Sequence, residues 1–259
     1  PGWHMECSTM SEKYLGKTFD IHGGGMDLVF PHHENEIAQT CSLHKNHDPD
    51  SFAHFWFHNG FVNVEGEKMS KSIGNIRLVH ELIKEYKGEV LRMTLLSAHY
   101  RQPLNWTKEV IKQNSTMLDR LYRTLKDLEH IDAYTNNHAL PQNILEGFYD
   151  DLNTPKVIAE LNILTNKVTK VDEEEKSLIK YCLLETGKVL GILQQDPGEW
   201  LGYGRSKNLD EATIENLIKD RNEARRNKNF EMADSIRKKL KESGIEIEDK
   251  SDGTIWRSD

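Results

Sequence analysis

The chain has 259 residues, of which 37% are hydrophobic and 29% are charged, enough for one large domain or two modest ones. No apolar run approaches the roughly 18 residues that a membrane-spanning helix needs. A net charge of −8 excludes a generic polyanion binder, so any contact with nucleic acid requires a local basic patch. Residues 219–242, with nine Lys and Arg against five Asp and Glu, are the candidate.

The pattern of the first 75 residues is typical of an α/β domain. Short strand-like segments occupy 18–21 and 60–64, and a helical pattern covers roughly 33–45. The first residue, Pro1, already stands inside motif-like sequence, so we expect a fragment of a longer protein. Three widely spaced cysteines make no disulfide framework and favour a reducing, cytoplasmic setting.

After residue 75 the pattern is almost purely helical. Two long helices are predicted from apolar positions three or four apart, and Thr154 before Pro155 is typical of an N-cap. The first helix carries Met117, Leu121, Leu125 and Leu128 on one face, and the second carries Val157, Leu161, Leu164 and Val168. A polar stretch over 194–208 suggests a linker, and two basic helices follow, at about 211–228 and 230–243.

The sharpest motif is Lys68-Met69-Ser70-Lys71-Ser72, followed by Ile73-Gly74-Asn75. Two lysines among small polar residues suit a loop over a triphosphate, where ammonium, hydroxyl and backbone N–H groups meet phosphate oxygens. A bare pair of lysines at this spacing is usually a solvated turn. The full pentapeptide with its trailing Gly-Asn resembles instead the signature of class I aminoacyl-tRNA synthetases.

A second cluster offers ligands of the types that zinc accepts. His32 and Glu36 stand four residues apart, on one face of a helix that Pro31 is placed to open, and Cys7 adds a thiolate. The alternative is a small buried cysteine and a polar surface run. Spacing alone does not decide between these, and neighbouring His33 and Glu34 offer other ligands.

A third motif, His22-Gly23-Gly24-Gly25-Met26-Asp27, follows a strand-like segment. Glycines there permit close approach of a ligand to the backbone, and the Asp can bind a ribose hydroxyl or an ammonium group. Glycine-rich turns are common after strands, so this motif gains weight only from its position between the other two.

Together these motifs resemble the cysteinyl-tRNA synthetase family in order and spacing. The resemblance implies a partial Rossmann-like α/β catalytic domain (1–75), a stem-contact connection (76–107), an all-α helical bundle (108–200) and a small C-terminal anticodon-binding module (209–259). The segments that carry it are Pro1–Ser8, Asp20–Gly25, Phe30–Glu36, Lys68–Ser72, Asp151–Pro155, Ala224–Asp234 and Gly253–Arg257.

The resemblance also implies partners and site residues. L-cysteine would be activated with ATP and Mg²⁺ and joined to tRNA(Cys), with Zn²⁺ held by Cys7, His32 and Glu36 and by a further Cys that the sequence lacks. It further implies a cysteine pocket formed by Trp3, His22, Gly24 and Asp27. The implied ATP site consists of Lys68, Ser70 and Lys71, and its two lysines are catalytic. The implied tRNA contacts are Arg225, Asp234, Asp249 and Trp256. Trp256 has a simpler alternative, which is packing against the preceding helices.

One family element has no counterpart. No His-Ile-Gly-His-like motif occurs in the sequence. We therefore expect that this polypeptide alone does not activate cysteine unless the rest of the catalytic domain is supplied. We expect the full-length protein to be a monomer. Two alternatives stay open: a ligase that joins activated cysteine to an amino sugar, and a non-catalytic tRNA-binding fragment.

Overall fold

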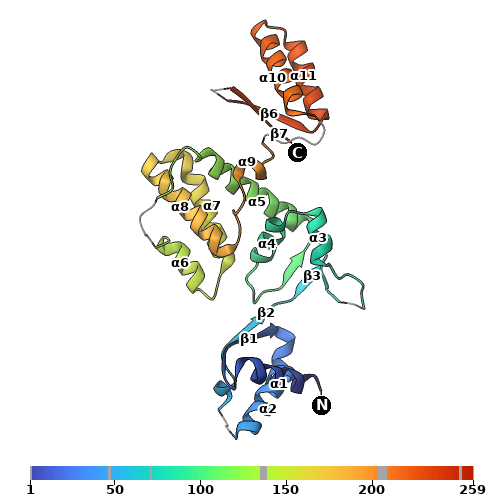
Figure 1. Cartoon of the computed structure of the whole chain (residues 1–259), viewed down its shortest axis with the longest axis vertical. Coiled ribbons are helices and arrows are strands. Elements are labelled where there is room, and N and C mark those ends of the chain that lie inside the picture. The colour runs from blue at the N-terminus through green and yellow to red at the C-terminus, as the bar shows by residue number, and fades with distance from the viewer. Residues whose placement is uncertain are drawn as a thin grey trace. The chain divides into compact units, whose positions relative to one another are not determined.

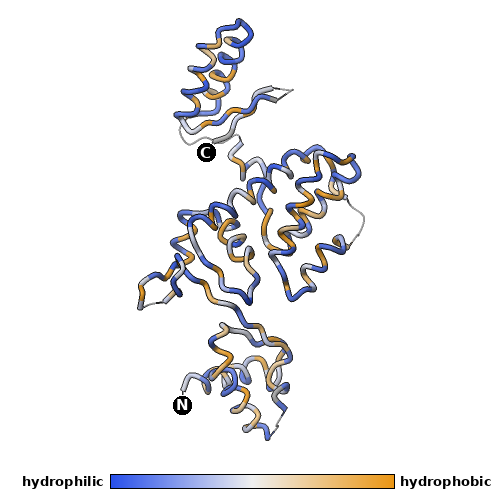
Figure 2. The backbone as a smooth tube through the Cα atoms, turned by 180° about the vertical axis from the view of Figure 1, so that it is seen from behind, coloured by the Kyte–Doolittle hydropathy of each residue, from blue (hydrophilic) through white to orange (hydrophobic). Residues whose placement is uncertain are grey.

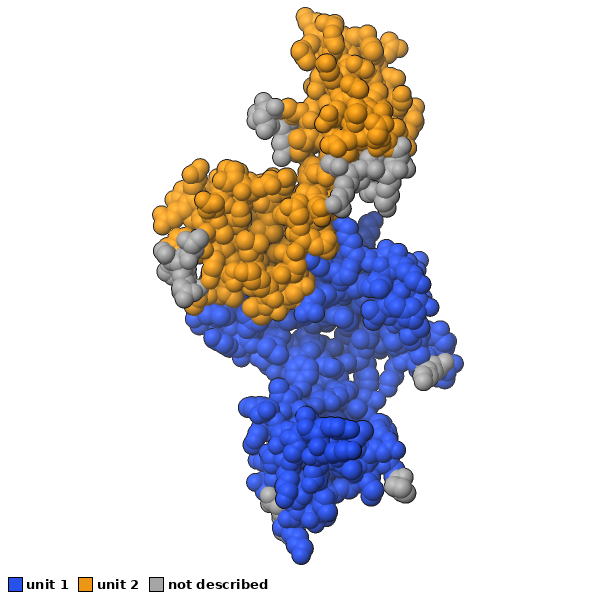
Figure 3. Space-filling view, viewed as in Figure 1, with its two compact units in different colours: residues 1–114, 142–158 blue, residues 115–141, 159–259 orange. Residues whose placement is uncertain are grey.

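The computed structural model describes residues 2–45, 48–70, 72–134, 139–203, 209–250 and 253–258. Contacts divide the chain into two compact units, drawn in Figure 3. The first comprises residues 1–114 and 142–158, and the second residues 115–141 and 159–259. Within the described ranges, no helix is both long and apolar enough to cross a membrane.

The first unit begins with an α/β layer in which strand β1 pairs in parallel with strand β2, Phe19 facing Ala53. Figure 1 shows helices α1 and α2 packed together beside this pair. Buried Phe19, Phe52 and Ala53 form a small core under the strands. The elements are α1 (Trp3–Leu15), β1 (Phe19–Gly25), short helical turns η1 (Met26–Leu28), η2 (Val29–His33) and η3 (Pro49–Ser51), α2 (Glu34–His44) and β2 (Ala53–Asn59).

A second, three-stranded sheet follows in the order β4-β3-β5. Strand β3 pairs antiparallel with β4 and parallel with β5, which returns from about 40 residues later in the chain. This pairing fixes the root of the segment that begins at Lys68. The elements are β3 (Val62–Val64), β4 (Glu67–Lys68), α3 (Val79–Glu85), α4 (Gly88–Leu96) and β5 (Leu104–Trp106).

Helices dominate the rest of the chain, as expected. Leu121, Leu125 and Leu128 are buried on one face of α5 and its extension, and fully buried Leu118 rather than Met117 completes that face. The helices are α5 (Lys108–Asp127), α6 (Gln142–Tyr149), α7 (Thr154–Lys167), the short turn η4 (Val168–Lys170), α8 (Glu173–Leu190) and α9 (Pro197–Trp200).

Two local predictions need correction. The predicted N-cap at Thr154 is wrong by one residue, because Asn153 Oδ1 accepts the backbone N–H of Lys156. Thr154 is the first helical residue, and its hydroxyl donates instead to the carbonyl of Leu96. A capping carboxamide satisfies an otherwise unpaired N–H at the helix start as well as a hydroxyl does.

The predicted linker at 194–208 is folded in its first part. Helix α9 lies within it, and the buried Trp200 donates from its indole N–H to Asp119 at 2.8 Å and stacks on Tyr122 at a centroid distance of 4.4 Å. These contacts fasten the segment to α5. Residues 204–208 lie outside the described residues.

The C-terminal module contains two helices and a hairpin, at positions close to those predicted. Helix α10 (Glu211–Arg226), helix α11 (Phe230–Glu242) and the antiparallel strands β6 (Ile245–Lys250) and β7 (Gly253–Ser258) enclose one hydrophobic cluster. In Figure 2 hydrophobic and hydrophilic positions alternate along both helices, as expected of helices with one buried face. The fold class is therefore an α/β layer followed by helices and a small module.

Candidate metal centre and associated sites

The turn that leads into α2 brings two ligand types to one face. Phe30 has an extended backbone before Pro31, and from Pro31 onward the chain turns into the helix. His32 and Glu36, four residues apart, therefore project together, and both are buried. Nε2 of His32 lies 2.8 Å from Oε1 of Glu36. Glu34, the alternative that the sequence left open, is exposed.

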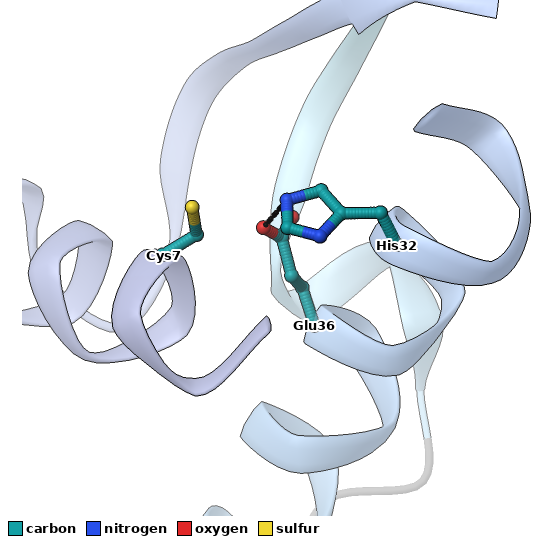
Figure 4. Close-up of side chains that lie close together, drawn as sticks. All are labelled: Cys7, His32 and Glu36. Carbon is teal, nitrogen blue, oxygen red and sulfur yellow. Dashed lines mark ion pairs between the residues drawn. The ribbon is translucent and has the colours of Figure 1, made fainter. Parts of the chain in front are cut away.

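Helix α1 supplies the third ligand type. The ligand atoms of Cys7, His32 and Glu36 all lie within 4.8 Å of one another. Figure 4 shows Cys7 on a separate helix from the other two, with the Glu36 carboxylate against the His32 ring. The sequence predicted these residues as a group, and the fold brings them together from segments about 25 residues apart.

A second triad shares the same carboxylate. His22, His33 and Glu36 also lie within 4.8 Å of one another, and Nε2 of His22 is 2.8 Å from Oε2 of Glu36. His33 in turn faces His58, with Nδ1 and Nε2 2.8 Å apart. The Glu36 carboxylate thus lies between two imidazoles, which sequence spacing could not reveal because His22 belongs to β1.

The electrostatics of the cluster favour an ionised carboxylate. Burial alone would raise the pKa of Glu36, but the adjacent imidazole of His22 and the charges of His32 and His33 lower that pKa below its ordinary value. Burial and the negative charge of Glu36 raise the pKa of the Cys7 thiol. Burial, with the neighbouring His22, lowers the pKa of His33 to about 4.

The residues present fit a bound cation. Glu36 is fully buried, and although two imidazole nitrogens lie close, neither of its oxygens makes a hydrogen bond of good geometry within the described residues. A buried carboxylate with incompletely satisfied oxygens is costly, and coordination of a cation would reduce that cost. A thiolate, an imidazole and a carboxylate together are a ligand set that zinc accepts. A cation would also lower the pKa of the Cys7 thiol.

Aromatic rings cover one side of this cluster. Trp3 stacks on His32 at a centroid distance of 4.2 Å, and its side chain remains 58% exposed. Nδ1 of His4 lies 2.7 Å from Nδ1 of His32. The indole face of Trp3 thus lies next to a candidate ligand and is still accessible to a small molecule.

Gly24 lies at the end of β1, against the histidines. A Cβ atom at this position would come within 3.0 Å of His33 and 2.9 Å of Leu28, so only glycine lets the strand approach so closely. Asp27 follows in the short turn η1 and is exposed. Trp3, His22, Gly24 and Asp27 all belong to the first unit.

The Lys68–Ser72 segment starts at the end of β4. The Lys68 ammonium lies 4.2 Å from the centre of the Phe61 ring. The hydroxyl of Ser70 lies 3.1 Å from that of Ser72 and accepts the N–H of Ile73. Lys71 lies outside the described residues, so its predicted role stays a prediction.

The four predicted tRNA-contact residues of the C-terminal module lie in different environments. Arg225 and Asp234 are exposed on α10 and α11. Asp249 is also exposed, but its carboxylate accepts two hydrogen bonds, each 2.8 Å long, from the buried Arg221, and a third from Arg225. The first of these partners, Arg221, holds the pKa of Asp249 well below its usual range.

Trp256 is only 9% exposed and packs in the cluster formed by the module's helices and β6. The ring cannot offer a face to a base without opening this core. Of the two interpretations weighed from the sequence, the structure favours packing. Trp256 thus belongs to the module's core, and sequence reasoning missed Arg221, the buried residue that pairs with Asp249.

Comparisons with known proteins agree with the motifs. Residues 1–116 match the family of tRNA synthetases class I (C) catalytic domain, and residues 211–257 match the cysteinyl-tRNA ligase anticodon binding domain. Cysteine–tRNA ligases of Parvibaculum lavamentivorans and Maricaulis maris are 51% and 47% identical to this chain over 99% of its length. The chain covers 55% of each of these relatives, so it spans about half their length.

A solved structure supports the fold alone. The LeuRS of Agrobacterium radiobacter K84, in a ternary complex with tRNA and LeuAMS, matches 70% of this chain and 27% of its own, with a TM-score of 0.52 and 19% identity. Two family matches, relatives that are about half identical to this chain over the matched span, and the cluster of ligand-type residues agree with one another. The chain belongs to the cysteinyl-tRNA synthetase family of class I aminoacyl-tRNA synthetases.

Proposed function

We propose that this chain supplies the zinc site, the signature loop and the tRNA-binding module of a cysteine–tRNA ligase. One observation carries the proposal: the ligand atoms of Cys7, His32 and Glu36 lie within 4.8 Å of one another, and neither oxygen of the fully buried Glu36 carboxylate makes a hydrogen bond of good geometry among the described residues. Zinc held there would bind a substrate thiolate in preference to the hydroxyl of serine, which matches cysteine closely in size.

The cysteine pocket is proposed on the exposed side of this centre. Trp3 would lie against the substrate beside His32, and His22 would fix the Glu36 carboxylate. Gly24 would leave room for the substrate, and the Asp27 carboxylate would accept from its ammonium group. These roles follow the family resemblance, and the positions of Trp3, His22 and Gly24 beside the triads support them.

Activation of cysteine would proceed with ATP and Mg²⁺. A carboxylate oxygen of cysteine attacks the α-phosphorus, the bond to the pyrophosphate oxygen breaks, and cysteinyl-adenylate and pyrophosphate form. The carboxylate is already ionised at pH 7, so no general base is needed. Lys68 and Lys71 would neutralise the growing charge on the phosphates, and Ser70 would donate a hydrogen bond.

The adenylate would then pass its cysteinyl group to tRNA(Cys). We propose Arg225 and Asp234 as contacts in the C-terminal module, with Asp249 and Trp256 in supporting roles, as their internal contacts favour. The match of residues 211–257 to an anticodon-binding domain favours tRNA over an amino sugar as acceptor. The proposed divisions remain 1–75, 76–107, 108–200 and 209–259.

The zinc proposal is tested by metal analysis of the purified chain. We expect one zinc per chain, lost or strongly weakened in Cys7→Ser and Glu36→Gln. Cys41→Ser is the matched control, because Cys41 is a free thiol outside the candidate metal groups. Zinc content that is equal in all variants, or absent throughout, would contradict the assignment.

Activation is tested separately, by cysteine-dependent ATP–pyrophosphate exchange. We propose that the 259 residues alone are inactive, because the His-Ile-Gly-His-like element is absent from them, and that the longer polypeptide is active as a cytoplasmic monomer. Robust exchange by the 259-residue chain would contradict this part of the proposal without touching the zinc site.

A further inference from the structure

The side chain of Asn75 closes the loop that follows β4. Its Oδ1 accepts the backbone N–H of Ser70 at 2.8 Å, and its Nδ2 donates to the backbone carbonyl of Lys68 at 3.3 Å. One carboxamide thus bonds the main chain on both sides of Met69. Asn75 is half-buried, so these bonds are partly shielded from water.

The remaining bonds of the turn point to the same closed shape. The N–H of Gly74 donates to the carbonyl of Ser70 at 3.2 Å, and Gly74 has a φ of 72°, which favours glycine. The N–H of Met69 donates to Val62 in β3 at 3.4 Å. The loop is therefore fastened to the sheet at one end and to Asn75 at the other.

The carboxamide of Asn75 supplies both bonds from two different atoms of one short side chain. It carries an acceptor and a donor on the same planar group, whereas an ionised aspartate of equal size only accepts. Aspartate would also place a negative charge beside a loop that is proposed to bind the phosphates of ATP. Alanine would remove both bonds and leave a longer, freer loop, with a larger entropy to lose when the loop orders.

We infer that Asn75 is a positioning residue for adenylate formation: it holds the backbone that carries Lys68 and Ser70, so that these groups meet the phosphates of ATP in one conformation. The inference rests on the proposed function, because it assigns Asn75 a task in that reaction. It goes further by naming a residue outside the five signature positions and by giving its mode of action.

The hydrogen bonds from Asn75 to the loop backbone are tested on this chain by hydrogen–deuterium exchange of the peptide that contains Ser70. We expect Asn75→Ala to speed exchange of the Ser70 amide by about tenfold, the effect of losing one hydrogen bond, and Asn75→Asp to leave it protected. Asn216→Ala, on the exposed face of α10, is the control and should change nothing at Ser70. Unchanged exchange in Asn75→Ala would overturn the inference.

Its catalytic consequence is tested in the longer synthetase polypeptide by ATP–pyrophosphate exchange. We expect kcat to fall about tenfold or more in both Asn75→Ala and Asn75→Asp, with the KM for cysteine unchanged, since a loop that acts on the transition state affects kcat rather than cysteine binding. A kcat within twofold of the wild type in both variants overturns the inference and leaves the proposed function standing. If the wild-type longer polypeptide shows no ATP–pyrophosphate exchange, the proposed function itself is overturned, whatever the result of the hydrogen–deuterium exchange.

Discussion

Replacing Trp256 by alanine separates a core residue from an RNA-stacking residue. The ring is 9% exposed among the helices and β6 of the C-terminal module. A buried Trp removes about 200 Å² from water, worth at most about 5 kcal/mol at 25 cal/mol/Å². With the cavity that remains, we expect Trp256→Ala to lower the stability of the module by about 3 to 5 kcal/mol.

The assay is native-state hydrogen exchange of amides in residues 211–257, which reports the opening free energy of the module separately from the rest of the chain. Phe230→Ala is the aromatic control, because Phe230 is 62% exposed at the start of α11 and should cost no more than about 0.5 kcal/mol. A Trp256→Ala variant that keeps its protection but loses tRNA binding would refute the core assignment, because a stacking residue costs affinity and not stability.

Three further changes test other parts of the fold. Asp249→Asn should remove a pH dependence of module stability, since Arg221 depresses the pKa of Asp249. The stability that the Asp249 carboxylate contributes is present above its unfolded pKa of about 4 and is lost as the pH falls toward the folded pKa. The stabilities of wild type and variant should therefore converge in an acid titration. Gly24→Ala should destabilise the first unit by about 1 to 3 kcal/mol in denaturant unfolding, because its Cβ would press on His33; an unchanged midpoint would contradict the close approach. Asp172→Ala should cost about 1 kcal/mol in thermal unfolding, since its carboxylate caps α8; no change would mean that water replaces the cap.

The sequence predicted those elements whose signals are local. Helix α2 and the pair α10 and α11 were predicted because apolar periodicity and Pro or Asx residues mark them. Helix α1 was not predicted, because Ser8 is its one buried residue among those described and no side chain caps its start, so no apolar stripe is visible. Helix α9 was hidden in a polar stretch, because it is only four residues long and Trp200 is its one large buried side chain among the described residues.

The candidate site was predicted in part. Motif order indicated Cys7, His32 and Glu36, and the structure brings them together. The approach of His22 to the same carboxylate depends on how β1 lies beside α2, which no spacing within the sequence encodes. Single residues were the weakest predictions: Trp256 satisfied both a stacking and a packing interpretation until its burial was known.

X-ray absorption at the zinc edge tests the proposed selection of cysteine most directly. In the zinc-loaded chain we predict one sulfur neighbour, from Cys7, together with nitrogen and oxygen ligands. Addition of L-cysteine should raise the number of sulfur neighbours to about two, and L-serine at the same concentration should leave the spectrum unchanged. A chain that binds no zinc, or a zinc spectrum that responds equally to both amino acids, would contradict the assignment of this centre to thiol recognition.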